Sequence, residues 1–358
     1  MTQKNEIPLL IAALSLATGI VGVGGWWLFN QFSGSGSNPL SGLSSGSWSG
    51  NASNSTANPI ANIDSAATFA DVTDVPAGLF SYGGSTTWAP IRGNIDPLIT
   101  QAHPAFRLRY TSPPTGAPGS ATGVQMLLDN QLAFAQSSRS LQPDEIAAAQ
   151  QKGFSLVEIP VALEAVAIAV NPDLTVDGIT IDQLKDIYTG QLTNWSQVGG
   201  PNLPIIPYSR RVEEGGTVEF FVDTVLGGIA LGANVQYLST TTEALRALDS
   251  TPGGIYYASA PEVIDQCSAK PIAIGIKPSQ LVPLHQLPLV PQSQCPNSRN
   301  QINPAVILDS SYPITRRLLV IVKEDGQTDQ SAGQAYANFI LSQQGQQLLE
   351  QSGFVRIR

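Results

Sequence analysis

The sequence is poor in the side chains that hold metals or form reactive sites. It has two cysteines and two histidines among 358 residues, and the spacing of Cys267 and Cys295 matches no zinc or redox motif. We therefore expect no metal site and no cofactor. Charged residues make up 13% of the chain and the net charge is −9, which disfavours nucleic acid as a partner. A small anion is not excluded, because local hydrogen-bond donors can hold one.

The chain also has a long stretch without any charge, residues 7–29. At about 1.5 Å per residue this stretch is long enough to cross a hydrocarbon core of roughly 30 Å. The alternative is a cleaved signal peptide, whose apolar region would be only about 7–15 residues long. Lys4 and the amino terminus are the only positive charges before Arg92. We therefore expect residues 1–6 in the cytoplasm, an uncleaved anchor, and the rest of the chain outside the cytoplasm.

The next segment, 30–75, is rich in serine, glycine and asparagine, and it carries no Lys, Arg, Asp or Glu between residues 33 and 62. Such a composition is typical of a flexible tether. If the following domain, 76–358, is exported, Cys267 and Cys295 can close a disulfide there; the alternative is two unpaired thiols in a loop-rich region. We favour the disulfide.

Residues 76–358 alternate short apolar strands with amphipathic helices, a pattern that predicts an α/β fold. Strands are expected at 79–82, 107–110, 157–159, 165–170, 205–208, 254–257 and 318–322. The clearest helices are expected from residue 124, over 218–225 and over 332–351.

Clusters of glycine, serine and threonine precede three predicted helices or follow predicted strands. They are Gly83-Gly-Ser-Thr-Thr87, Gly119-Ser-Ala-Thr-Gly123 and Gly215-Gly-Thr217. The amino terminus of a helix has unpaired N–H groups and a positive dipole, so several such ends together can bind an anion. For any one cluster, simple helix capping is an alternative. Three clusters together with Arg139 and Arg211 favour a site for a tetrahedral oxyanion.

These segments resemble those of the phosphate-binding receptors of ABC transporters. The resemblance runs from about Pro76 to the carboxyl terminus. It rests on Ser85-Thr-Thr87, Gly119–Gly123, Phe134–Arg139 and Arg211–Thr217, with further similarity in Gly178–Trp195, Asn194–Gly200, Gly253–Tyr257, Tyr312–Thr315 and Tyr336–Leu341.

The resemblance implies a two-lobed fold of the type II periplasmic-binding-protein kind with a two-strand hinge. Lobe one would comprise about 76–163 and 313–358, lobe two about 164–312, and the hinge would lie near 164–170 and 309–314. The implied phosphate-binding residues are Thr86, Thr87, Ser120, Ser138, Arg139, Arg211, Gly216 and Thr217.

Two positions depart from the family pattern. An aspartate that many members carry is replaced at Ser138-Arg139, and a serine is replaced by Gly215. That aspartate would accept a hydrogen bond from a protonated phosphate oxygen and repel sulfate, so its absence weakens the physical argument for phosphate over sulfate. Phosphate remains the leading expected ligand.

The function expected from the resemblance is capture of inorganic phosphate by a membrane-tethered monomer that delivers it to ABC permease subunits. An alternative is an oxyanion sensor or interaction module that has no transporter. A phosphatase is less favoured, because the sequence offers no nucleophile paired with a base and no metal site. We therefore expect a binding protein and not an enzyme.

Overall fold

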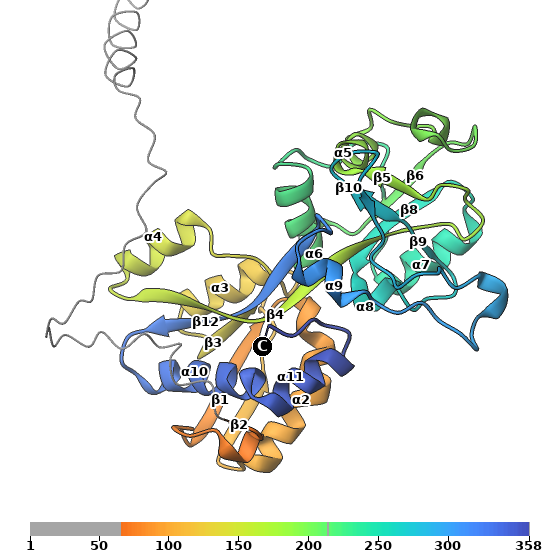
Figure 1. Cartoon of the computed structure of the whole chain (residues 1–358). Helices are drawn as coiled ribbons and strands as arrows, with labels where there is room; N and C mark the ends of the chain where they lie inside the picture. The colour runs from red at the N-terminus through yellow and green to blue at the C-terminus, as the bar shows by residue number, and fades with distance from the viewer. Residues whose placement is uncertain (1–65, 213–214, 358) are drawn as a thin grey trace, which may run out of the picture. The chain divides into compact units, whose positions relative to one another are not determined.

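The computed structural model describes residues 66–212 and 215–357 (Figure 1). Chain contacts divide the protein into residues 1–57 and 58–358, and the described residues belong to the second unit. The predicted cytoplasmic segment, the apolar segment 7–29 and most of the 30–75 linker therefore lie outside the described residues. Within 66–212 and 215–357, no helix is both long enough and apolar enough to cross a membrane.

The main sheet runs through the whole unit in the order β2-β1-β3-β12-β4-β8-β6-β7. Its first half contains β1 (Gly78–Gly84), β2 (Phe106–Tyr110) and β3 (Phe134–Ser137). These three strands are parallel, with β1 in the middle, while β12 (Thr315–Glu324) pairs antiparallel with β3. Because β1 and β3 are parallel neighbours, the residues that follow them emerge at the same edge of the sheet.

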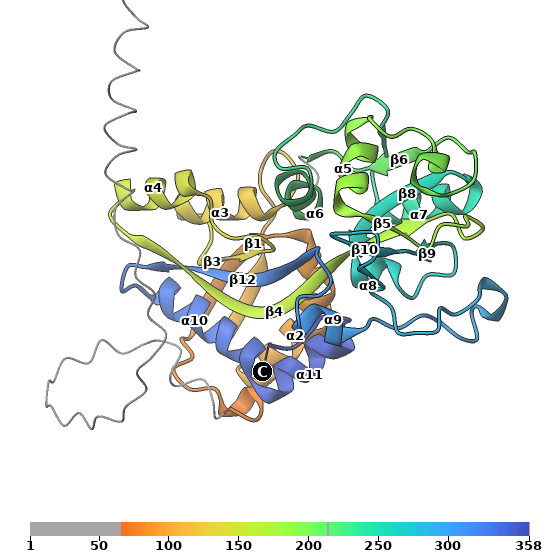
Figure 2. The same cartoon turned by 45° about the horizontal axis from the view of Figure 1, so that its top comes forward.

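Helices cover both faces of this half of the sheet. On one face, α2 (Ala89–Ala102), α10 (Thr328–Leu341) and α11 (Gln343–Gln351) enclose a core around Trp88, Phe134 and Tyr336. On the other face, α3 (Ser120–Leu128) and α4 (Pro143–Gln151) enclose a smaller core around Val124 and Leu127. Figure 2 shows the sheet between these two sets of helices. We call this assembly lobe one.

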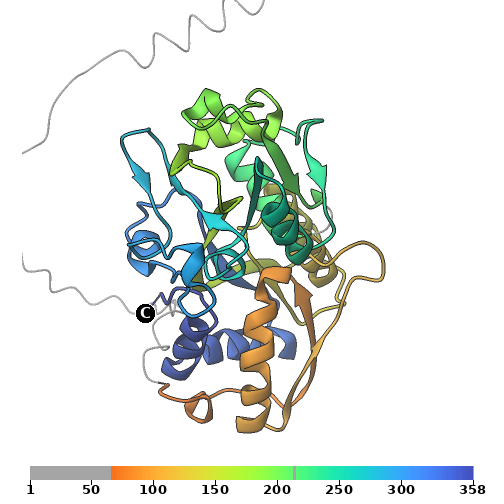
Figure 3. The same cartoon turned by 90° about the vertical axis from the view of Figure 1, so that its right-hand side faces the viewer.

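Lobe two has its own core, built largely from residues between Ala165 and Ile314. Its share of the main sheet is β6 (Ile206–Ser209), β7 (Gln236–Tyr237), β8 (Gly254–Ser259) and β9 (Lys270–Pro271). A separate small sheet joins β5 (Gly178–Thr180), β10 (Ala273–Gly275) and β11 (Leu281–Val282). The principal helices are α5 (Ile181–Thr189), α7 (Thr241–Ser250), α8 (Ala260–Val263) and α9 (Pro304–Leu308). In Figure 3 the orange and dark blue segments from the two ends of the described chain lie side by side, although the green and cyan segments separate them in sequence.

One strand, β4 (Ser155–Val170), belongs to both lobes. It pairs with β12 as far as Ala165 and then with β8 from Val166 onward. The sequence predicts two strands here, 157–159 and 165–170, and Pro160 between them lacks an N–H and would normally interrupt a sheet. The structure keeps one continuous strand: the register shifts between Leu318 and Leu319 of β12, opposite this proline.

The carboxyl-terminal helix also differs from the expectation of a single helix over 332–351. The helix is interrupted at Ser342, whose backbone is extended with ψ of 160°. The Ser342 hydroxyl then accepts a hydrogen bond from the Gly345 N–H at 3.1 Å and caps α11. In the same way, the predicted helix over 218–225 is α6 (Gly216–Phe220) followed by a π-helical turn, Phe221–Val225.

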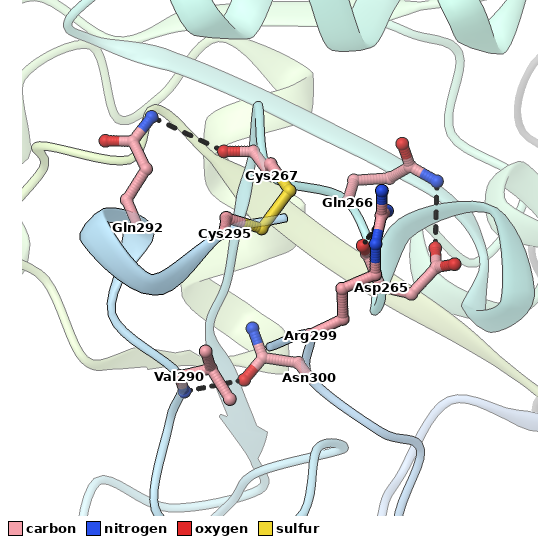
Figure 4. Close-up of a disulfide and its surroundings, with 8 residues drawn as sticks. All are labelled: Asp265, Gln266, Cys267, Val290, Gln292, Cys295, Arg299 and Asn300. Atoms are coloured by element: carbon pink, nitrogen blue, oxygen red, sulfur yellow. Dashed lines mark hydrogen bonds between the residues drawn. A yellow bond between two sulfur atoms is a disulfide. The ribbon is translucent and has the colours of Figure 1, made fainter. Parts of the chain in front are cut away.

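Cys267 and Cys295 form a disulfide that closes a loop of 28 residues in lobe two (Figure 4). Beside it, the Arg299 guanidinium donates to the Asp265 carbonyl at 2.8 Å, and the Asn300 side chain accepts from the Val290 N–H at 2.8 Å. The disulfide and these bonds fix the ends of a segment that has little regular secondary structure.

Candidate functional site

Three of the polar segments singled out in the sequence meet at one edge of lobe one. Ser85 follows β1, Ser138 follows β3, and Ser120 begins α3. The Ser85 hydroxyl donates to the Ser138 hydroxyl at 2.9 Å, and the Ser120 hydroxyl lies 3.3 Å from the same oxygen. All three side chains are fully buried. We call Ser85, Ser120 and Ser138 the serine cluster.

The local sequence explains why α3 begins so close to β1. A Cβ atom on Gly123 would lie 2.5 Å from the Gly84 Cα, so only glycine allows the first turn of the helix to approach the strand this closely. The approach brings Ser120 to the Ser138 N–H, which donates to its hydroxyl at 3.1 Å. The serine cluster therefore depends on Gly84 and Gly123, which the sequence identifies only as parts of segments that could bind an anion.

Lobe two contributes Gly216, at the start of α6. A Cβ atom on Gly216 would lie 2.9 Å from the Ser138 hydroxyl oxygen, 3.0 Å from that of Ser120 and 3.3 Å from that of Ser85. The bare backbone of lobe two is thus seated directly against the serine cluster of lobe one. Any side chain here would force the two segments apart.

Two threonines meet beside this contact. The hydroxyl oxygens of Thr87 in lobe one and Thr217 in lobe two are 3.4 Å apart. One nitrogen of Arg316, Nη2, donates to Thr87 at 3.0 Å and to Thr217 at 2.9 Å, and Nη1 donates to the Gly216 carbonyl at 3.3 Å. Arg316 therefore contacts both lobes at the site.

Arg316 is a residue that the sequence reasoning missed. Its Nε lies 2.7 Å from a carboxylate oxygen of Glu164, and both side chains are buried. The other oxygen of Glu164 accepts a hydrogen bond from the Ser259 hydroxyl. The sequence does contain an indication of this ion pair. Glu164 lies inside the apolar run Val161–Val170, and a charged side chain that is buried needs a partner of opposite charge.

Arg139, a predicted ligand, is occupied by two carboxylates. It forms two parallel bonds to Glu145 of α4, Nη1 to Oε2 at 3.0 Å and Nη2 to Oε1 at 2.8 Å. Its Nε bonds to Glu219 of α6 at 2.7 Å. Glu145 belongs to lobe one and Glu219 to lobe two, so Arg139 links the lobes by an ion pair.

A cavity of about 220 Å³ opens next to the threonine pair. Lobe one lines it with Thr86 and Thr87, and lobe two lines it with Gly215 and Thr217. The remaining lining residues are Ala89, Pro90, Arg210, Val218, Thr241, Tyr256, Tyr257, Ala258, Ser259, Pro261 and Glu262. Of the eight predicted ligands, Thr86, Thr87 and Thr217 thus line this space. The other five, Ser120, Ser138, Arg139, Arg211 and Gly216, are not among its lining residues.

Glu262 is the acidic residue among those that line this cavity. Its side chain is exposed to solvent but lies between the lobes. There, desolvation by the surrounding protein raises the pKa of its carboxyl, and the negative charge of Glu164 raises it further.

Arg211 lies elsewhere in the structure. It is exposed, and its guanidinium carbon stands 4.9 Å from the centre of the Tyr237 ring. Arg210, its neighbour, lines the cavity and approaches Gly215, where a Cβ atom would lie 3.2 Å from its Nη1. The role of Arg211 as an anion clamp therefore stays a prediction.

The described part of the chain also contains no group of three or more His, Cys, Asp or Glu side chains placed to hold a metal ion. The chemistry of the site is instead that of hydroxyl and backbone N–H donors next to arginines. Such donors bind an oxyanion without covalent chemistry.

A family model described as a PBP superfamily domain matches residues 58–344. The chain belongs to the PBP superfamily. It is 28% identical over 290 residues to the phosphate-binding protein PstS of Borreliella burgdorferi, an alignment that covers 78% of this chain and 90% of that one. It is 24% identical over 275 residues to the PstS protein of Staphylococcus haemolyticus, with 76% of this chain and 79% of the relative covered.

Among solved structures, an ABC-type phosphate transport receptor from Vibrio cholerae superposes with a TM-score of 0.61 at 21% identity. The alignment covers 77% of this chain and 99% of the receptor. This similarity confirms the α/β, type II periplasmic-binding-protein-like fold expected for the domain. The three relatives are named for binding or transport, in agreement with the expectation that the chain is not an enzyme.

Proposed function

We propose that this protein captures inorganic phosphate between its two lobes and passes it to an ABC-type permease. The observation that carries the proposal is the meeting of Gly216 with the serine cluster and of Thr217 with Thr87, next to a cavity that both lobes line. The names of the PstS relatives and of the phosphate transport receptor support the choice of phosphate.

In this proposal the serine and threonine hydroxyls and the backbone at Gly216 and Thr217 hold the oxygens of the anion. Thr86, Thr87, Ser120 and Ser138 act from lobe one, and we add Ser85 to them because its hydroxyl belongs to the same cluster. Hydrogen bonds from such groups to an ionised oxygen are about twice as strong as neutral ones. Closure of the lobes around phosphate would assemble donors from both sides.

Arg139 and Arg211 have different parts in the proposal. Arg139 is already held by Glu145 and Glu219, so it would act by joining the lobes around the ligand. Arg211 would have to turn from Tyr237 toward the cleft to clamp the anion. We propose it as a ligand only for the phosphate-bound form.

We further propose that the folded unit works outside the cytoplasm, tethered through residues 7–29, with 30–75 as a spacer. The disulfide supports an oxidising compartment, where such bonds form and persist. The 23 uncharged residues of segment 7–29 support an anchor. Delivery to permease subunits as a monomer completes the proposal.

Calorimetric titration of the full-length protein with phosphate, sulfate, arsenate and molybdate tests it. Phosphate should bind with a Kd in the micromolar range or below, about −8 kcal/mol or stronger. Phosphate and arsenate should behave alike because both are protonated tetrahedral anions near neutral pH. Absence of binding by all four anions would overturn the proposal, and binding of sulfate alone would change the ligand.

A further inference from the structure

The buried Arg316 contacts the two threonines proposed to hold the anion, one from each lobe. We propose that Arg316 is a positioning residue: by donating to Thr87 and Thr217, it turns their hydroxyl hydrogens toward an oxyanion in the adjacent cavity. This inference rests on the proposed function and names a residue that sets the strength of the same site.

The hydrogen-bonding capacity of the two threonine hydroxyls supports this role. A threonine hydroxyl has one hydrogen to donate and two lone pairs that accept. The two hydrogens of Arg316 Nη2 reach Thr87 at 3.0 Å and Thr217 at 2.9 Å, so each hydroxyl is an acceptor toward the arginine. Each must then direct its own hydrogen elsewhere.

The two hydroxyls can satisfy only one of those hydrogens between themselves. Their oxygens are 3.4 Å apart, which allows at most one weak bond in one direction. At least one hydroxyl hydrogen therefore remains, and both threonines line the cavity. An oxyanion placed there receives it, and donation from a charged group to the same oxygen strengthens that hydrogen bond.

Arg316 itself has little capacity left for direct contact with a ligand. Arg316 has five N–H hydrogens. It donates the one on Nε to Glu164, the two on Nη2 to the threonines and one on Nη1 to the Gly216 carbonyl. Its charge is balanced by Glu164, which faces it directly across the β4 and β12 pairing. Arg316 can therefore contribute more to anion binding by orienting the two threonine hydroxyls than by contacting the anion directly.

The test needs a variant that removes the donors without leaving Glu164 charged and alone. The paired substitution Arg316→Met with Glu164→Leu does this, because a buried ion pair replaced by apolar side chains of similar volume often costs little stability. Arg317→Gln is the matched control, since Arg317 is the next residue along β12 and is exposed. Phosphate Kd is measured by calorimetry for the full-length proteins, with thermal unfolding as a check of folding.

The paired variant should bind phosphate at least tenfold more weakly than the wild type, whereas Arg317→Gln should bind it equally well. A double-mutant cycle then separates positioning from a purely structural role. In a Thr87→Val, Thr217→Val background, the paired substitution should change the Kd by less than about threefold, because the hydroxyls through which Arg316 acts are gone.

Equal losses in both backgrounds would overturn the inference, as would wild-type affinity in the paired variant. If the wild type binds no oxyanion, the proposed function fails first, so the two failures are distinguishable. Arg316→Lys is the second variant in case the paired one does not fold. It keeps a charge for Glu164 but cannot reach both threonines from one planar group, and an affinity equal to wild type would equally refute the role.

Discussion

Gly216→Ala tests whether the seating of lobe two on the serine cluster controls ligand binding. The added methyl carbon would lie 2.9 Å from the Ser138 oxygen and 3.0 Å from the Ser120 oxygen, against the 3.4–4 Å of ordinary contacts. The clash falls on two buried hydroxyls that hydrogen-bond within the serine cluster, so either the segments separate or the hydroxyls leave their positions in the cluster. Alanine is otherwise compatible with the backbone here, because Gly216 is the first residue of α6 and does not have a positive φ.

The substitution should therefore leave the folding of lobe two intact and specifically impair closure. We expect phosphate Kd in calorimetry to rise at least tenfold, which is about 1.4 kcal/mol, while the thermal midpoint without ligand falls by no more than a few degrees.

Gly93→Ala is the matched control, since Gly93 lies within α2 and a Cβ atom there would meet no atom within 4 Å. It should bind phosphate as the wild type does and be equally or slightly more stable. Unchanged phosphate affinity in Gly216→Ala would refute the idea that the contact between Gly216 and the serine cluster controls ligand binding.

Three further predictions concern other parts of the molecule. Arg211→Ala should weaken phosphate binding at least tenfold in calorimetry if Arg211 turns into the cleft, whereas unchanged affinity would remove it from the site and direct attention to Arg210, which lines the cavity. Asp96 is desolvated, which raises its pKa to about 6 despite hydrogen bonds from Tyr82 and Tyr336. Its folded pKa thus exceeds its unfolded value of 3.8, so the stability it contributes is complete below about pH 4 and is lost as pH rises through 6. Urea unfolding between pH 4 and 7 should show this loss in the wild type but not in Asp96→Asn, and parallel profiles would contradict it. Replacing both Cys267 and Cys295 by serine should lower the free energy of unfolding by about 3–4 kcal/mol, the entropy of closing a 28-residue loop, and a loss below about 1 kcal/mol would show that the loop is already constrained.

The parts of the site that the sequence could predict are those encoded locally. Glycine, serine and threonine before a helix signal an exposed helix amino terminus, and this pattern alone singles out Ser120 and Gly216. Ser120 then meets Ser85 and Ser138 because β1 and β3 are parallel neighbours and end at one edge. Apolar runs bounded by turn residues also predicted β1, β2, β4, β6, β8 and β12, but they did not predict β3, the strand that precedes Ser138.

The parts that the sequence could not predict depend on register and long-range pairing. Arg316 and Glu164 are 152 residues apart, and only the alignment of β12 with β4 brings them together. Glu219 meets Arg139 across 80 residues and across the two lobes. The break at Ser342 was missed because neither glycine nor proline marks it; the serine cap alone starts the new helix.

The pairing of these buried arginines bears on how the site would bind an anion. Arg139 is matched by Glu145 and Glu219, and Arg316 is matched by Glu164, so neither offers an unbalanced positive charge to a ligand. The negative charge of phosphate would then be met chiefly by neutral donors, whose strength falls steeply as distances and angles depart from their optimum. The relative position of the lobes consequently matters more than net attraction. It is held by the same contacts that assemble the donors: the Gly216 backbone against the serine cluster, the Arg139 to Glu219 bond, and the Arg316 bonds to a threonine from each side.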